Sequence, residues 1–180
     1  MKLDKLFGSK AKADILKYLV FRRQGISIRA FEWELEWSFP AIKKQIDQLE
    51  DAGAVEIKKD SAKRSIYLTK GFGDHIKEFF IYALQHDLRA YFDVQGTRIE
   101  KYFWGKLFGV QLEMDLVLIY HPDEQVQLDS IKEDINNIFR QYLIEYVSVV
   151  FMTVPDFEKR YRLADKFVLH LMRQTKTSEV

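Results

Sequence analysis

One helix pattern, closed by a glycine and followed at once by two extended segments, constrains this chain most. Three apolar residues spaced by four and three would form one buried stripe on this helix: Ile42, Ile46 and Leu49. The helix would begin near Ser38, with Pro40 in its first turn, where a missing N–H costs nothing. Gly53 follows its end, the usual place for a left-handed cap. The other faces of this helix are then left for polar contacts.

Two shorter helices are expected before this one. Ser9 is the expected N-cap of the first, which should end near Gly25. Ser27 is expected to cap the second, which runs through Leu35. The chain therefore opens with three helices in succession.

A hairpin and a long helix are expected after it. Short extended runs at Ala54–Lys58 and Ser65–Thr69 predict two strands, joined by the polar turn Lys59–Arg64. A broad apolar stripe then predicts a helix from about Asp74 to Tyr91. The front half thus reads as helix, helix, helix, hairpin and long helix.

The back half has a different pattern of apolar residues. A spacing of four indicates a helix through three apolar residues: Ile99, Phe103 and Leu107. Strands are expected at Leu112–Tyr120 and Tyr146–Met152, with a helix between them over residues 127–142. Thr153 matches a further helix start with a capping box. Strand, helix and strand predict a right-handed crossover with parallel strands, so the fold class is α+β, with a small α/β C-terminal domain.

Composition narrows the class of protein. The 180 residues are 47% hydrophobic and include no cysteine, so a packed core is expected, and disulfides, thiolate metal sites and cysteine nucleophiles are excluded. No apolar run reaches the roughly 20 residues that span a bilayer, so we expect a cytoplasmic protein without a membrane partner. Residues 1–92 hold 17 basic and 13 acidic side chains, whereas residues 93–180 hold 11 and 14. This asymmetry points to two units with different partners.

The first elements, in this order and with these lengths, resemble a winged helix-turn-helix of the ArsR/MarR type found in bacterial and archaeal regulators. Residues 49–53 (Leu-Glu-Asp-Ala-Gly) reproduce the family's ending of the recognition helix, and Lys58–Ile66 would be the wing. The resemblance covers roughly residues 5–70. It implies a winged-helix DNA-binding domain over residues 1–72.

Double-stranded DNA is the partner that this resemblance implies, and the residue types on the free faces agree. The expected groove contacts on the recognition helix are Ala41, Lys43, Lys44, Gln45 and Gln48. The expected phosphate contacts on the wing are Lys58, Lys59, Lys63 and Arg64. Lysine and glutamine can reach base edges, and cations on a wing can contact phosphate. A solvated face without a ligand is the alternative for these side chains.

The second helix favours another use of the same shape. Residues 31–37 include three glutamates, which are unfavourable beside phosphate, and Glu36-Trp37 stands where the family often has glycine. Trp33 and Trp37 either pack inside or form a protein-facing patch. The alternative function is therefore a protein-interaction module that keeps the winged-helix shape.

Part of the back half resembles a minimal nucleotidyltransferase domain, over roughly residues 95–172. In that family two acidic residues one apart, here Glu113 and Asp115, point the same way on a strand and share magnesium. The alternative places both on the solvated face of a half-buried strand. The family's Gly-Ser phosphate loop is missing, and its third acidic position holds Ser148. We therefore expect no catalytic residue, metal or cofactor, and an inactive nucleotidyltransferase-like domain over residues 95–180; a divergent nucleotidyltransferase is the remaining alternative.

Residues 73–94 are expected to connect the two domains and to pair subunits. Winged-helix regulators commonly dimerise through such helices, and a two-fold homodimer would match a palindromic operator. Packing of the apolar stripe between the two halves is the alternative. The prediction as a whole is a DNA-binding transcriptional regulator, not an enzyme, with a non-catalytic C-terminal sensing or dimerisation domain. No pattern identifies a small-molecule effector.

Overall fold

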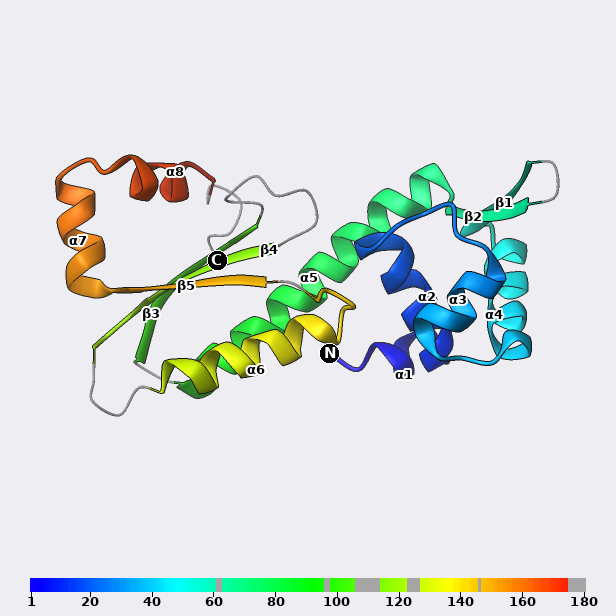
Figure 1. Ribbon diagram of the computed structural model, residues 1–180, viewed down its shortest axis with the longest axis horizontal. Helices are drawn as coiled ribbons and strands as arrows, with labels where there is room; N and C mark the ends of the chain where they lie inside the picture. Colours follow the sequence, from blue (N-terminus) through cyan, green and yellow to red (C-terminus); the bar gives the residue numbers. More distant parts are fainter. Residues whose placement is uncertain (61–62, 96–97, 106–113, 123–126, 146, 175–180) are drawn as a thin grey trace. The chain divides into compact units, whose positions relative to one another are not determined.

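Short polar residues start the helices of the first part of the chain. The computed structural model describes residues 1–60, 63–95, 98–105, 114–122, 127–145 and 147–174 (Figure 1). The first helices are α1 (Leu3–Phe7), α2 (Lys10–Phe21), α3 (Ile28–Leu35) and α4 (Phe39–Asp51). Ser9 Oγ accepts a hydrogen bond from the Lys12 amide at 3.3 Å, and Ser27 Oγ accepts one from the Ala30 amide at 3.2 Å. Both predicted N-caps are confirmed, whereas α1 was not predicted.

The predicted hairpin is present, but its strands are longer than expected. β1 (Val55–Asp60) and β2 (Lys63–Leu68) pair antiparallel, with Lys59 opposite Arg64 in the ladder. The prediction that Lys59–Arg64 forms the turn is therefore wrong. A ribbon that extends into solvent needs no apolar residues at its end, so polarity did not mark where the strands stop.

The long helix α5 (Lys70–Gln95) extends beyond the predicted range at both ends. Its stripe is buried at Ile76, Phe80, Ala83, Leu84 and Leu88. Rings of α1 and α2 cover the first part of this stripe: Phe7 lies 5.8 Å and Phe21 lies 6.1 Å from Phe80, measured between centroids. The stripe that was predicted to pair subunits is thus packed inside the chain over this part.

The chain divides into two compact units, Met1–Asp87 and Leu88–Val180. The division falls within α5, so the last turns of this helix belong to the second unit. The first unit contains α1 to α4 and the β1–β2 ribbon. Its most deeply buried side chains include Phe31, Ile42, Ile46, Ile66 and Leu84.

A three-stranded sheet forms the centre of the second unit. Its elements are β3 (Ile99–Gly105), β4 (Met114–Tyr120), α6 (Leu128–Arg140), β5 (Val147–Thr153), α7 (Val154–Arg162) and α8 (Lys166–Gln174). The strand order is β3–β4–β5, with β3 antiparallel and β5 parallel to β4. The predicted parallel pair is confirmed, and so is the Thr153 cap, whose Oγ1 accepts from the Asp156 amide at 3.3 Å. The predicted helix through Ile99 and Phe103 is wrong, because these residues form β3; Leu107 lies outside the described residues.

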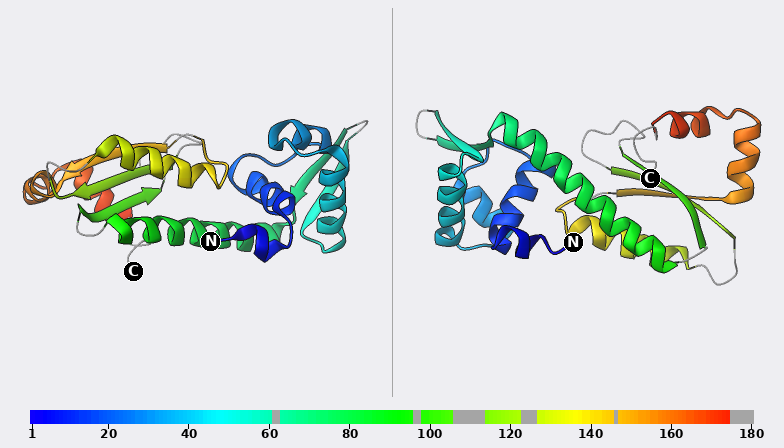
Figure 2. Two further views of the ribbon diagram at one scale, coloured as in Figure 1. Left: turned by 90° about the horizontal axis from the view of Figure 1, so that it is seen from below. Right: turned by 180° about the vertical axis from the view of Figure 1, so that it is seen from behind.

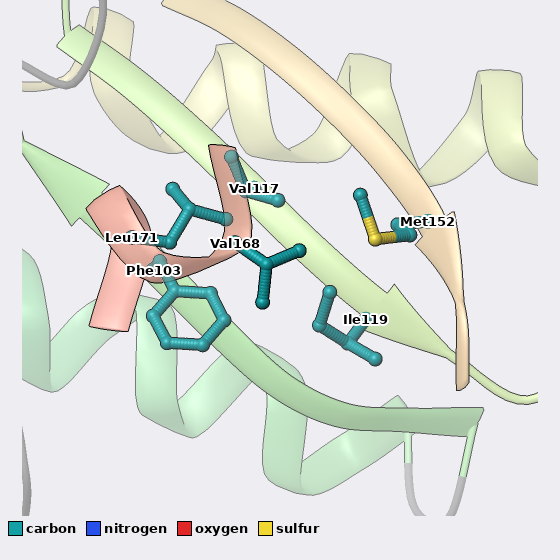
Figure 3. Packing of buried hydrophobic residues seen from close by; sticks show 6 residues of the cluster. All are labelled: Phe103, Val117, Ile119, Met152, Val168 and Leu171. Atoms are coloured by element: carbon teal, nitrogen blue, oxygen red, sulfur yellow. The ribbon is translucent and has the colours of Figure 1, made fainter. Parts of the chain in front are cut away.

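Apolar residues cover both faces of this sheet. On one face α8 packs on the strands through a cluster shown in Figure 3: Phe103, Val117, Ile119, Met152, Val168 and Leu171. The intervening β4 residues Leu116 and Leu118 are equally buried on the opposite face, behind which α6 lies in Figure 3. The ring of Phe92 in α5 lies 4.6 Å from that of Tyr102 in β3. The protein is therefore an α+β fold, with an antiparallel ribbon in one unit and a mixed sheet in the other. No helix in the described residues is long and apolar enough to cross a bilayer.

Candidate nucleic-acid interface

A three-residue turn joins α3 to α4, from Glu36 to Ser38. Turns of three to four residues between two helices are typical of the helix-turn-helix motif. Glu36 adopts the left-handed conformation, with φ of +55°. Glycine adopts this conformation most easily, and here glutamate accepts the strained backbone.

Side chains from α2 and α3 hold this turn in place. Ser38 makes no side-chain cap bond, and the Phe39 amide instead donates to Glu32 Oε1 at 3.2 Å. Trp37 Nε1 donates to Asp14 Oδ2 at 3.2 Å. A carboxylate at the first amide of a helix also opposes the positive end of its dipole. Glu32 and Asp14 therefore fix where α4 begins.

The acidic residues of α3 are partly engaged within the unit. Glu32 caps α4, and Glu34 Oε1 accepts from Arg23 Nη2 at 3.1 Å. Arg23 also donates through Nε to the Tyr18 hydroxyl, and this bond, with the nearby Glu34 charge, raises the pKa of its guanidinium. The negative charge of Glu34 is thereby balanced locally. Residue types alone did not show these two contacts, because the partners, Phe39 and Arg23, lie outside α3.

The outer faces of α4 carry different kinds of residue. Ala41, Lys44 and Gln48 are spaced by three and four and share one stripe, on which Lys44 and Gln48 are exposed. Lys43 lies on another flank and forms an ion pair with Asp47, with Nζ 2.7 Å from Oδ2. Charge along the helix is divided as well, with both lysines in the first half and Asp47, Glu50 and Asp51 in the second.

Gln45 differs from its predicted outward position. The side chain is half-buried, and its Oε1 is buried with no hydrogen-bond partner among the described residues. A buried carbonyl oxygen cannot accept from a base. Gln45 stands between the apolar stripe and the polar stripe of α4, and packing decides which way such a boundary side chain turns.

The predicted wing residues lie on two faces of the ribbon. Lys59 and Arg64 are exposed, directly opposite each other, on the face whose base buries Val55 and Ile66. Lys58 lies on the other face, where Nζ is 2.8 Å from Glu56 Oε1 and 4.9 Å from the centre of the Tyr67 ring. The bond to Glu56 raises the pKa of Lys58. Lys63 pairs with Asp60 in the ladder, and its side chain lies outside the described part of the chain.

A glycine sets the direction in which the ribbon leaves α4. Gly53 has φ of +71°, as the predicted left-handed cap requires. The Thr69 hydroxyl donates to the Gly53 carbonyl at 2.8 Å, which ties the end of β2 to the start of β1. Both views in Figure 2 show α4 and the ribbon next to each other. The helix and the ribbon are therefore held as one surface.

The second unit gives no support for phosphoryl transfer in its described residues. Asp115 is buried, with 3% of its surface exposed, so its predicted alternative place on a solvated face is wrong. Ser148 stands beside Asp115 in the β4–β5 ladder, and Glu113 lies outside the described residues. In the described ranges, no group of three or more histidine, aspartate or glutamate side chains is placed to hold a metal ion.

Comparisons with known proteins give similarities to solved structures alone. No family model matches the sequence, and no curated protein matches it. A mutant of ZitR from Lactococcus lactis shares 17% identity over 48% of this chain and 59% of its own, with a TM-score of 0.40. The transcriptional regulator SlyA shares 12% identity over 78% of this chain and 80% of its own, with a TM-score of 0.44. The transcriptional regulator Tm0710 from Thermotoga maritima shares 22% identity over 48% of this chain and 67% of its own, with a TM-score of 0.35. The winged-helix character of the first unit rests on its own element order, its turn and its hairpin.

Proposed function

We propose that the chain is a DNA-binding transcriptional regulator whose first unit docks on double-stranded DNA, with α4 in the major groove. The observation that carries this proposal is the turn between α3 and α4. Glu32 and Trp37 hold it, and α4 carries Lys44 and Gln48, both exposed, on one stripe. In helix-turn-helix proteins the first residues of the second helix contact base edges.

The residues of this surface have separate roles in the proposal. Lys44 and Gln48 reach base edges, and the methyl group of Ala41 makes an apolar contact with a thymine methyl group. Lys59 and Arg64, side by side at the ribbon's end, contact phosphate. Lys43 and Lys58 contribute less, because each already has a carboxylate partner within the unit.

The proposed organisation keeps the predicted bounds but moves dimerisation out of residues 73–94. Residues 1–72 bind DNA, residues 73–94 connect, and residues 95–180 form a non-catalytic domain for sensing or dimerisation. A homodimer is proposed because two identical winged helices match a palindromic site. It would be held through the second unit, since the α5 stripe is covered by Phe7 and Phe21 in the first.

Fluorescence anisotropy with a labelled duplex at several salt concentrations tests the proposal. Binding should weaken steeply with salt, because each phosphate contact releases counterions. Lys59→Ala and Arg64→Ala should each lower the slope of log K against log salt by about one. Lys132→Ala, which removes an exposed lysine from α6, is the matched control and should leave the slope unchanged. Undetectable binding at low salt, or a double variant that binds like the wild type, would overturn the proposal.

A second function is favoured by one observation. Trp33 on α3 is 83% exposed, a large apolar surface beside acidic side chains, as a protein-contact patch would require. Trp37 belongs to the turn and is excluded from such a patch by its bond to Asp14. A photo-crosslinking residue in place of Trp33 should capture a specific protein in the source cells if the winged helix serves protein contact. Duplex binding that depends on Lys59 and Arg64, with no protein captured at this position, would remove this second function.

A further inference from the structure

The two edges of the β3–β4–β5 sheet differ in how they are protected. β3 carries Glu100 and Lys101, with a register shift between Ile99 and Lys101. β5 has seven residues, Val147–Thr153, without a charge, a proline or a glycine, and its register with β4 is continuous. Charges and bulges are the usual means of keeping an edge strand from pairing with another chain. β3 therefore has this protection and β5 has none.

The outer backbone groups of β5 have no partner in the described residues. β4 is the one strand that pairs with β5, and no backbone hydrogen bond outside this ladder involves Val147–Met152 within the described part of the chain. Figure 3 shows β5 outermost in the sheet, on the side away from β3. An edge strand directs about half of its amides and carbonyls away from its neighbour. The outer side of β5 is thus a row of donors and acceptors that suits one kind of partner, another strand.

We propose that this partner is β5 of a second copy of the chain, paired antiparallel so that the sheet continues across a two-fold axis. Self-pairing centred on Val150 places Val150 opposite itself, Val149 opposite Phe151 and Ser148 opposite Met152. Every pair is neutral, and pairs of β-branched and aromatic residues stabilise antiparallel ladders. A two-fold contact is closed, so pairing stops at a dimer instead of continuing into a fibre.

The second copy suits this edge better than an unrelated strand. Recognition of a foreign strand relies on side-chain pockets or charges beside the ladder. β5 offers no charge, and its first five side chains are each half-buried in the chain's own packing, with Val150 against the α8 cluster. Pairing through the backbone alone does not select a partner by its side chains. A second copy of β5 is favoured because every other molecule of this protein carries it. This inference rests on the homodimer in the proposed function and supplies its interface.

The absence of cysteine makes a sharp test possible. Directly opposed residues of an antiparallel pair have Cα atoms about 4.5–5.5 Å apart, within the range that a disulfide spans. Val150→Cys, a change of similar size, should form a covalent dimer under mild oxidation. Lys101→Cys on the protected edge is the matched control and should form no covalent dimer under the same oxidation. Sedimentation equilibrium should show a wild-type dimer at micromolar concentration, and Val149→Lys should weaken it by about tenfold or more.

The outcomes separate the interface from DNA binding. A monomeric wild type, a covalent dimer through Lys101→Cys but not through Val150→Cys, or an undiminished dimer in Val149→Lys would overturn the β5 interface. The circular dichroism spectrum and urea midpoint of Val149→Lys show whether the variant is folded, and Val150→Cys gives an independent reading if it is not. If the interface were wrong but the monomer still bound the labelled duplex in the anisotropy assay, the DNA-binding proposal would remain supported.

Discussion

At the scale of single residues, Glu36 is the point of greatest backbone strain in the helix-turn-helix. Its φ of +55° is unfavourable for a residue with a Cβ atom and easy for glycine. Glycine also gives the unfolded chain more freedom, which offsets part of the gain. Glu36→Gly should therefore raise the free energy of unfolding by about 0.5 kcal/mol, measured by urea denaturation. Glu34→Gly, inside α3, is the control and should lower the free energy of unfolding by about 1 kcal/mol. A loss of stability in Glu36→Gly would show that the turn is not strained.

Tyr91 links stability to alkaline pH. Burial raises the pKa of its hydroxyl, and so does the bond that this hydroxyl donates to Asp134 at 3.0 Å. The folded state therefore binds the proton more tightly than the unfolded state. The stabilisation is complete below the ordinary pKa of 10.0 and is lost as the pH rises above it.

The wild type should accordingly lose stability relative to Tyr91→Phe as the pH increases past this value. Urea midpoints of the two proteins across the alkaline range measure the effect. Tyr82→Phe is the control for the loss of a tyrosine hydroxyl from the surface, since Tyr82 is 59% exposed. A constant difference for Tyr91→Phe would contradict the expectation.

At the scale of elements, α4 depends on a cap from another helix. The Phe39 amide has the Glu32 carboxylate as its partner, because Ser38 makes no side-chain cap bond. Glu32→Ala should cost about 1 kcal/mol of stability, the usual value of an N-cap, and weaken duplex binding by fraying the first turn of α4. Glu32→Gln keeps an oxygen at the same place and should restore most of both. Equal effects of the two variants in urea denaturation and anisotropy would mean that charge and not capping is what matters.

Elements with local signals could be predicted from the sequence. Ser9, Ser27 and Thr153 lie three residues before the amides that they cap, so each helix start is visible in a few residues. β3 was mistaken for a helix because a spacing of four also occurs by chance in a strand that is half-buried or buried over Tyr102–Trp104. Its identity depends on pairing with β4, which is not local.

The candidate site divides in the same way. The stripe of Ile42, Ile46 and Leu49 set which faces of α4 are outside, and Lys44 and Gln48 followed from it. Local spacing did not show that Lys43 would turn to Asp47, nor that the Gln45 oxygen would be buried. The roles of Glu32 and Asp14 had no local signal, since each acts on a residue in another element.

At the scale of the whole molecule, the division at Asp87 predicts that the first unit is self-sufficient. Its apolar core comes from α1, α2, α3, α4, the ribbon and the first turns of α5. A chain of residues 1–95 includes all of these and omits residues 96–180, which hold 11 basic and 13 acidic side chains. We expect it to fold, as seen by a cooperative urea transition, and to bind a single half-site at least as tightly as the intact chain at low salt. It should lose the extra affinity of the intact chain for duplicated half-sites, because linkage through the second unit is what makes the second contact intramolecular.

A fragment that folds and still prefers duplicated sites would place dimerisation in the first unit, and an unfolded fragment would mean that the stability of the first unit depends on the second.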